Sequence, residues 1–190
     1  PVAVRVAPRE SAVKPGGKAV IAVELEHAEG YHTWPSASTK LPESVADFAI
    51  RTEFILLNAP AWATLDGVQY APTHPDKVAN PDGSGIPLEV PLFSGRAVGY
   101  LRIILAPDAP TGEQYLAIGV NFQACDASQC QMPEEQEHTV KFTIAADAAA
   151  AAPAEPALFT NFDDSKWSAG TPTVTPSNTT STPPPTTAPT

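Results

Sequence analysis

Clusters of Gly and Pro cut the greater part of this chain into short runs of β-forming residues. In the last run, the apolar residues Val140, Phe142 and Ile144 alternate with polar ones, which is the two-residue period of a strand with one buried face. Seven or more short strands without a convincing helix predict an all-β fold, a β-sandwich of immunoglobulin type. The expected strands lie within residues 18–28, 48–60, 88–95, 97–107, 113–124 and 137–145.

The composition changes sharply near residue 146. Beyond it the chain becomes AADAAAAAPAEPA, then a short aromatic island, LFTNFDDSKW, and finally TPTVTPSNTTSTPPPTTAPT. A Thr/Pro/Ser tract has too few apolar residues to offset its conformational entropy. We therefore expect one folded domain over 1–146 and an Ala/Pro- and Thr/Pro-rich linker or disordered tail over 147–190. The sequence leaves open whether the island at 158–167 docks on the domain.

Charge and hydropathy exclude two classes of partner. The formal net charge is −10 and Lys and Arg form no cluster, so a nucleic-acid binder and a ligand of anionic membranes are both disfavoured. No run of 18 apolar residues exists, so this fragment is not expected to span a membrane. We expect a monomer.

The two cysteines of the chain, Cys125 and Cys130, follow the run at 113–124 and allow three interpretations. A structural disulfide would close a loop that contributes only about 2 kcal/mol through chain entropy. A metal site would need further ligands such as His32, His74, His138 or Met132, and no spacing supports one. A redox pair needs two nearby sulfurs at an accessible loop, which this position offers. The residues alone leave the redox and structural interpretations open.

The stretch VNFQACDASQCQMP resembles the cysteine motif of the N-terminal periplasmic domain of the thiol:disulfide interchange protein DsbD. The family motif is a strand ending in V-x-[YF]-Q-[GA]-C, followed after a few residues by C-x-P-P. Two upstream stretches, EGYHTW and LDGVQY with the later GIPLEVPL, are similar to further family segments. Two departures are visible, since Met132 precedes a single proline and the gap between the cysteines is short. The matching residues are Val120, Phe122, Gln123, Ala124, Cys125, Cys130 and Pro133.

The resemblance implies an immunoglobulin-like domain that takes electrons from a thioredoxin-like domain and passes them to oxidised proteins. It assigns the redox role to Cys125 and Cys130, with Cys130 forming the mixed disulfide. It also implies a loop that shields the sulfurs, here the segment 69–86 with Tyr70 and His74. The location would be periplasmic or otherwise extracytoplasmic after removal of a signal peptide, and the tail would tether the domain to a membrane domain. No cofactor is implied.

The residues around the pair predict slow reaction with small molecules. Asp126, Glu134, Glu135 and Glu137 flank the cysteines, and negative neighbours disfavour a thiolate. Exchange would then depend on a docked partner, as in a thiol:disulfide oxidoreductase. The alternative from another class is a secreted immunoglobulin-like binding or adhesion module with a fixed disulfide.

Overall fold

The computed structural model describes residues 1–80, 83–149, 153 and 155–169, and it confirms the all-β immunoglobulin-like sandwich. No helix in this described part has the length and hydropathy of a membrane span. Of the linker or tail expected over 147–190, residues 150–152, 154 and 170–190 lie outside the described residues. The elements are β1 (Val2–Pro8), β2 (Ala12–Val13), β3 (Lys18–His27), β4 (His32–Thr33), α1 (Glu43–Ala46), β5 (Glu53–Leu57), β6 (Ala63–Gln69), β7 (His74–Val78), β8 (Leu88–Ser94), β9 (Arg96–Leu105), β10 (Gly112–Phe122), β11 (Ala124–Cys125), β12 (Glu134–Ile144) and the 3-10 turn η1 (Pro156–Leu158).

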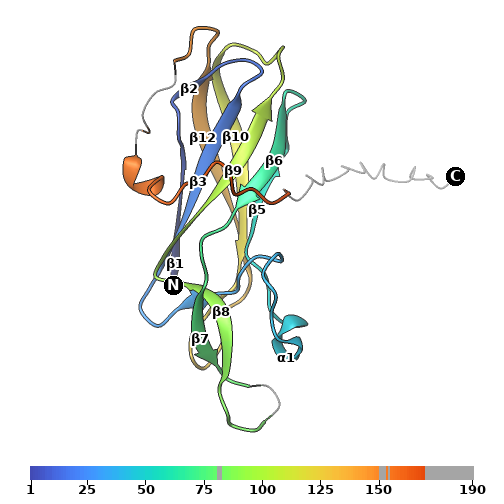
Figure 1. Ribbon diagram of the computed structural model, residues 1–190, viewed down its shortest axis with the longest axis vertical. Helices are drawn as coiled ribbons and strands as arrows, with labels where there is room; N and C mark the ends of the chain where they lie inside the picture. Colours follow the sequence, from blue (N-terminus) through green and yellow to red (C-terminus); the bar gives the residue numbers. More distant parts are fainter. Residues whose placement is uncertain (81–82, 150–152, 154, 170–190) are drawn as a thin grey trace, which may run out of the picture.

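Two four-stranded sheets form the sandwich. Sheet A has the order β1-β3-β9-β6, and sheet B has the order β2-β12-β10-β5 (Figure 1). Alternate side chains of both sheets fill the main core, among them Ile21, Leu101, Ile118 and Phe142. The alternation of apolar and polar residues in the sequence thus becomes one buried and one outward face.

A third sheet, sheet C, closes one end of the sandwich and positions the cysteines. Its order is β11-β4-β8-β7, and Figure 1 shows the β7–β8 hairpin and α1 at this lower end. A second hydrophobic cluster lies beneath sheet C and includes Trp34, Val45, Leu92 and Cys125. The end of the molecule that carries the cysteines therefore has its own small core.

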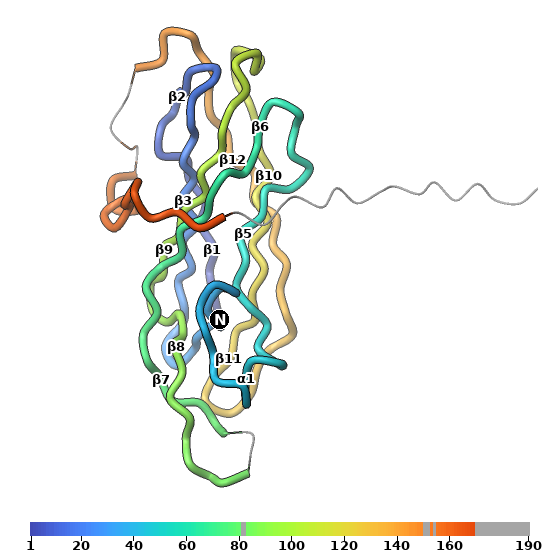
Figure 2. Tube along the Cα trace, turned by 45° about the vertical axis from the view of Figure 1, so that its right-hand side comes forward, coloured from blue at the N-terminus to red at the C-terminus, as the bar shows by residue number. Residues whose placement is uncertain are grey.

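Residues 155–169, which we call the C-terminal strap, cross the outer face of sheet A (Figure 2). Leu158 and Phe159 are buried against Val20, Ala22 and Tyr100. Strand β3 is consequently buried on both faces from Ala19 to Leu25, which explains its nearly continuous apolar sequence.

Polar contacts hold the strap along its length. The Tyr100 hydroxyl donates to the carbonyl of Leu158 at 2.8 Å, and the Gln69 amide donates to two strap carbonyls at 2.9 and 2.7 Å. Val68 and Ser168 exchange backbone hydrogen bonds of 2.9 and 3.0 Å, so the strap adds a β-bridge to the edge of β6.

Two arginines, Arg102 on β9 and Arg9 just after β1, also pack on aromatic rings of the strap. The guanidinium of Arg102 lies 4.6 Å from the Trp167 ring centroid, and that of Arg9 lies 4.7 Å from the Phe162 centroid. The sequence left open whether the island at 158–167 docks on the domain, and in the structure its aromatic residues pack on an apolar stripe of sheet A. The division of the chain at residue 146 otherwise stays a prediction.

Candidate functional site

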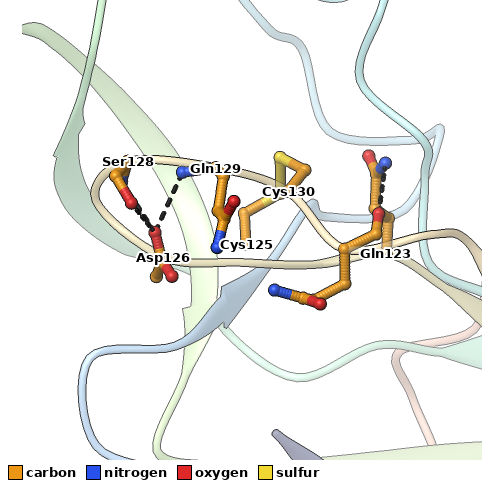
Figure 3. The surroundings of a disulfide bond; sticks show 7 residues. Gln123, Cys125, Asp126, Ser128, Gln129 and Cys130 are labelled. Carbon is orange, nitrogen blue, oxygen red and sulfur yellow. Dashed lines mark hydrogen bonds between the residues drawn. A yellow bond between two sulfur atoms is a disulfide. The ribbon is translucent and has the colours of Figure 1, made fainter.

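Cys125 and Cys130 lie directly opposite each other in a short hairpin that follows β10. They form an antiparallel bridge, their Cα atoms are 3.9 Å apart, and a disulfide joins their sulfurs (Figure 3). Cys125 ends β11, which pairs with β4 in sheet C. The loop between the sulfurs is thus carried at the end of the sandwich on strands from two sheets.

The loop has its own hydrogen-bond network. Asp126 Oδ1 accepts bonds from the Ser128 hydroxyl and the Ser128 backbone N–H, both at 2.7 Å, and from the Gln129 backbone N–H at 2.9 Å (Figure 3). The Ser128 hydroxyl, followed by these backbone donors, lowers the pKa of the Asp126 carboxyl. At the base of the loop, the Gln131 N–H donates to Ala124 O at 2.8 Å. These bonds define the hairpin independently of the disulfide.

The two sulfurs differ in accessibility. Cys125 is 1% exposed and packs in the cluster beneath sheet C, whereas Cys130 is exposed. A sulfur nucleophile from another protein would therefore meet Cys130 first. The difference in exposure indicates which cysteine a partner would attack, which the spacing in the sequence does not.

An open cavity of about 220 Å³ lies beside the disulfide. Its wall is largely apolar and aromatic, and Phe48 remains 50% exposed at this wall. The Trp34 ring meets the rings of His32 and Phe48 edge-on, at centroid distances of 6.4 and 6.2 Å. The lining residues are His32, Trp34, Phe48, Val78, Ala79, Cys125, Asp126, Ala127, Ser128, Gln129 and Cys130.

Trp34 contributes a buried donor to this wall. Its side chain is 3% exposed, and its indole N–H has no hydrogen-bond partner among the described residues. Its backbone is fixed, since the Thr52 hydroxyl donates to Trp34 O at 2.6 Å. An indole held in this way gives the cavity a rigid aromatic side.

His32 is a titratable residue that lies opposite the buried Cys125 in the strand pairing. It pairs directly with Cys125 between β4 and β11 and is 7% exposed. Burial lowers the pKa of His32, and the carboxylates of Asp76 and Asp126 act against that lowering. Burial thus favours the neutral imidazole of His32 over the imidazolium.

The residues of the cysteine motif have structural positions around the loop. Phe122 is fully buried in the main core, and the Gln123 amide donates to Gln131 O at 3.0 Å (Figure 3). Pro133 is exposed and lies just before β12. Phe122 anchors the strand, and Gln123 helps to close the base of the loop.

Tyr70 and His74 occupy different environments in the segment expected to shield the sulfurs. The Tyr70 ring stacks on Phe54 and Phe93 at centroid distances of 4.9 and 6.5 Å, and its hydroxyl accepts a bond from the Phe54 N–H at 3.3 Å. Burial raises the pKa of Tyr70 to about 12. His74 is exposed and begins β7.

The part of the 69–86 segment that lines the cavity is Val78 with Ala79, at the end of β7. The segment therefore does reach the disulfide, but through small apolar side chains. A shielding role for Tyr70 and His74 stays a prediction, and any such role for Tyr70 would be indirect, through the packing of Phe54 and Phe93.

The metal interpretation has no cluster to support it in the described part of the chain. No group of three His, Cys, Asp or Glu residues is placed there to hold an ion. Of the histidines considered, His32 lies on β4, His74 on β7 and His138 on β12 of sheet B.

Sequence reasoning considered His32 beside the sulfurs only as a possible metal ligand, and it did not assign Trp34 or Phe48 to the site. The stretch EGYHTW held a usable signal, because residues two apart in a strand face the same side and His32 and Trp34 are two apart. Phe48 gave no such signal, since α1 and the turn that follows it bring it to the cavity.

No protein family and no curated protein matches this sequence. Among solved structures, the N-terminal periplasmic domain of ScsB from Proteus mirabilis is similar over 80% of this chain and 48% of that chain, with 13% identity and a TM-score of 0.46. The reduced N-terminal domain of Neisseria meningitidis DsbD covers 72% of this chain and 84% of its own, with 11% identity and a TM-score of 0.39.

A third similar structure is the seventh ScaB type I cohesin from Pseudobacteroides cellulosolvens. It covers 78% of this chain and 96% of its own, with 9% identity and a TM-score of 0.38. The chain spans about half the length of the ScsB chain that it matches. Structural similarity at such low sequence identity and TM-score assigns no function.

Proposed function

We propose that this chain is an extracytoplasmic thiol–disulfide exchange module in which Cys125 and Cys130 cycle between dithiol and disulfide. It takes electrons from a thioredoxin-like donor and passes them to oxidised proteins. The observation that carries this proposal is the pairing of one exposed and one buried sulfur beside an apolar cavity. The cysteine motif in the sequence supports the same activity.

The geometry suits attack from outside. A donor thiolate that reaches Cys130 forms a mixed disulfide with it, and the Cys125–Cys130 bond breaks with Cys125 as the leaving thiolate. The exposed ring of Phe48 and the side chain of Val78 offer apolar surface beside the sulfurs. A partner docked there would exclude water from the sulfurs. A small molecule would not do so, in line with the expectation from the sequence that exchange with small molecules is slow.

A purely structural disulfide explains less of the site. The loop is already closed by the bonds to Asp126 and by the Gln131 N–H, and the disulfide would add only about 2 kcal/mol through chain entropy. A staple also needs neither an open cavity nor a difference in accessibility between its sulfurs. If the following experiment shows no electron transfer, the alternative of a binding or adhesion module with a fixed disulfide is favoured.

We expect the oxidised chain to be reduced by a thioredoxin-like protein that carries a reduced dithiol. The measurement is a gel shift after alkylation of free thiols at intervals following mixing. The wild-type chain should gain two alkylated thiols while the donor loses two. The Cys125→Ala/Cys130→Ala double variant is the control, and the donor should stay reduced in its presence.

A wild-type chain that stays fully oxidised with several thioredoxin-like donors would argue against the exchange function. The stability of the double variant must be measured alongside. A large loss of stability in the double variant, together with no transfer in the wild type, would favour the structural disulfide and the binding module.

Shielding of the sulfurs can be tested at Val78. We expect Val78→Ser to speed the reaction of the reduced pair with a small aromatic disulfide, because Val78 lines the cavity. Tyr70→Phe keeps the stacked ring and serves as the matched comparison within the same segment. Equal rates for wild type and Val78→Ser would show that the segment does not limit access to the sulfurs.

A further inference from the structure

His32 and Cys125 are cross-strand neighbours at the cavity. They are direct partners in the antiparallel pairing of β4 with β11, and both line the cavity at the disulfide. Directly opposite residues project their side chains to the same face, with Cβ atoms about 4.5–5.5 Å apart. The imidazole therefore lies beside the buried member of the cysteine pair.

The burial of His32 favours the neutral form of its ring. Burial lowers its pKa, and the charged groups that oppose this are Asp76 on β7 and Asp126 in the disulfide loop. His27 on β3 is the other titratable group that couples to His32, and burial lowers its pKa too. A neutral imidazole has one nitrogen that donates and one that accepts.

Cys125 needs such an acceptor more than Cys130 does. Its side chain is buried among Trp34, Val90 and Leu92, and apolar surroundings disfavour a thiolate. To close the disulfide again, however, the Cys125 sulfur must attack as a thiolate. A residue that is 1% exposed has little contact with water, which favours a base supplied by the protein.

We propose that His32 is the base that accepts the thiol proton of Cys125 each time the disulfide re-forms. This inference rests on the proposed exchange function and deepens it. It makes His32 a catalytic residue of the same site.

One cycle transfers two electrons through two thiol–disulfide exchange steps. The Cys130 thiolate attacks an oxidised protein, which forms a mixed disulfide and releases one partner thiolate. The Cys125 S–H proton then moves to His32, the Cys125 thiolate attacks Cys130, and the second partner thiolate leaves. Two electrons pass from the dithiol to the partner disulfide, and the imidazolium returns its proton to the departing thiolate or to water.

The test uses an aromatic disulfide, 5,5′-dithiobis(2-nitrobenzoate), whose coloured thiolate is released once in each step. With the reduced full chain, the first release reports the attack by Cys130 and the second reports the closure by Cys125. We expect His32→Gln to slow the second release about 100-fold near neutral pH, the lower end of a general-base contribution, and to leave the first release unchanged. The deficit should shrink as alkaline pH ionises Cys125 directly.

The matched control is His138→Gln, which changes a partly buried histidine on β12 in sheet B. Its two releases should equal those of the wild type. If His32→Gln closes at the wild-type rate across the pH range, the inference on His32 is overturned while the exchange function stands. If the wild type itself gives no second release, the pair does not cycle and the proposed function fails.

A second measurement needs no variant of His32. Imidazole titrations followed by NMR in the wild-type protein should give different midpoints for His32 in the disulfide and dithiol forms, because a thiol beside the ring couples to its proton. Identical His32 midpoints in the two forms would overturn the proton transfer, even if His32→Gln failed to fold.

Discussion

The Cys125→Ala variant will trap a thioredoxin-like partner covalently, whereas Cys130→Ala will not react with it. Cys130 is exposed and remains free to form a mixed disulfide in the first variant, and no second cysteine is left to release the partner. In the second variant the remaining sulfur is 1% exposed, so the partner cannot reach it. The measurement is the yield of covalent complex on a non-reducing gel, with the partner supplied as an activated mixed disulfide.

Both variants should keep the fold, because the loop is also closed by bonds to Asp126 Oδ1. We expect each to lose no more than about 2 kcal/mol of unfolding free energy, measured by urea denaturation. Equal trapping by the two variants would contradict the assignment of Cys130 as the attacked sulfur. No trapping by either variant, with a large loss of stability in both, would mean that the bridge is structural.

Phe159→Ser will destabilise the chain by about 2–4 kcal/mol, although it lies outside the domain expected from composition. Phe159 is buried with Leu158 against Tyr100, and burying a large apolar side chain contributes about 1.5–3 kcal/mol. A hydroxyl in its place also puts a polar group against apolar surface. The measurement is the urea midpoint of the full chain together with the products of limited proteolysis.

Wild-type chain should give a protease-resistant fragment that ends near residue 169, and Phe159→Ser should give one that ends near residue 146. The exposed Thr160, changed to Ser, is the neighbouring control and should behave as wild type. Gly67→Val tests the same contact from the sheet, since an added Cβ at Gly67 would meet the Trp167 side chain at 3.2 Å. A wild-type fragment that ends near 146 would contradict a docked strap.

The fold class could be predicted from the sequence because the two-residue alternation of apolar and polar side chains and the turn residues are local signals. The run at 137–145 became β12 with Val140 and Phe142 inside, as its alternation predicted. The strap could not be predicted in the same way. Its sequence looks like an island in a linker, and the apolar stripe that receives it is assembled from β1, β3 and β9, which are distant in the chain.

The site, like the fold, was predictable only where its residues are neighbours in the sequence. The cysteine pair and its loop were visible, because Cys125 and Cys130 are neighbours in sequence. The accessibility of each sulfur was not, since the cluster that buries Cys125 is built from Trp34 after β4 and from residues of α1 and β8. The cavity wall likewise depends on pairings in sheet C that bring His32 opposite Cys125.

The reduction potential of the Cys125–Cys130 pair is the most direct test of the exchange function. It is obtained by equilibrating the full chain with mixtures of reduced and oxidised glutathione and counting alkylated thiols at each ratio. A pair that relays electrons is predicted to lie near about −200 mV, within reach of extracytoplasmic thiol–disulfide partners. A potential below about −300 mV, typical of a structural disulfide that resists the glutathione pool, would contradict the account.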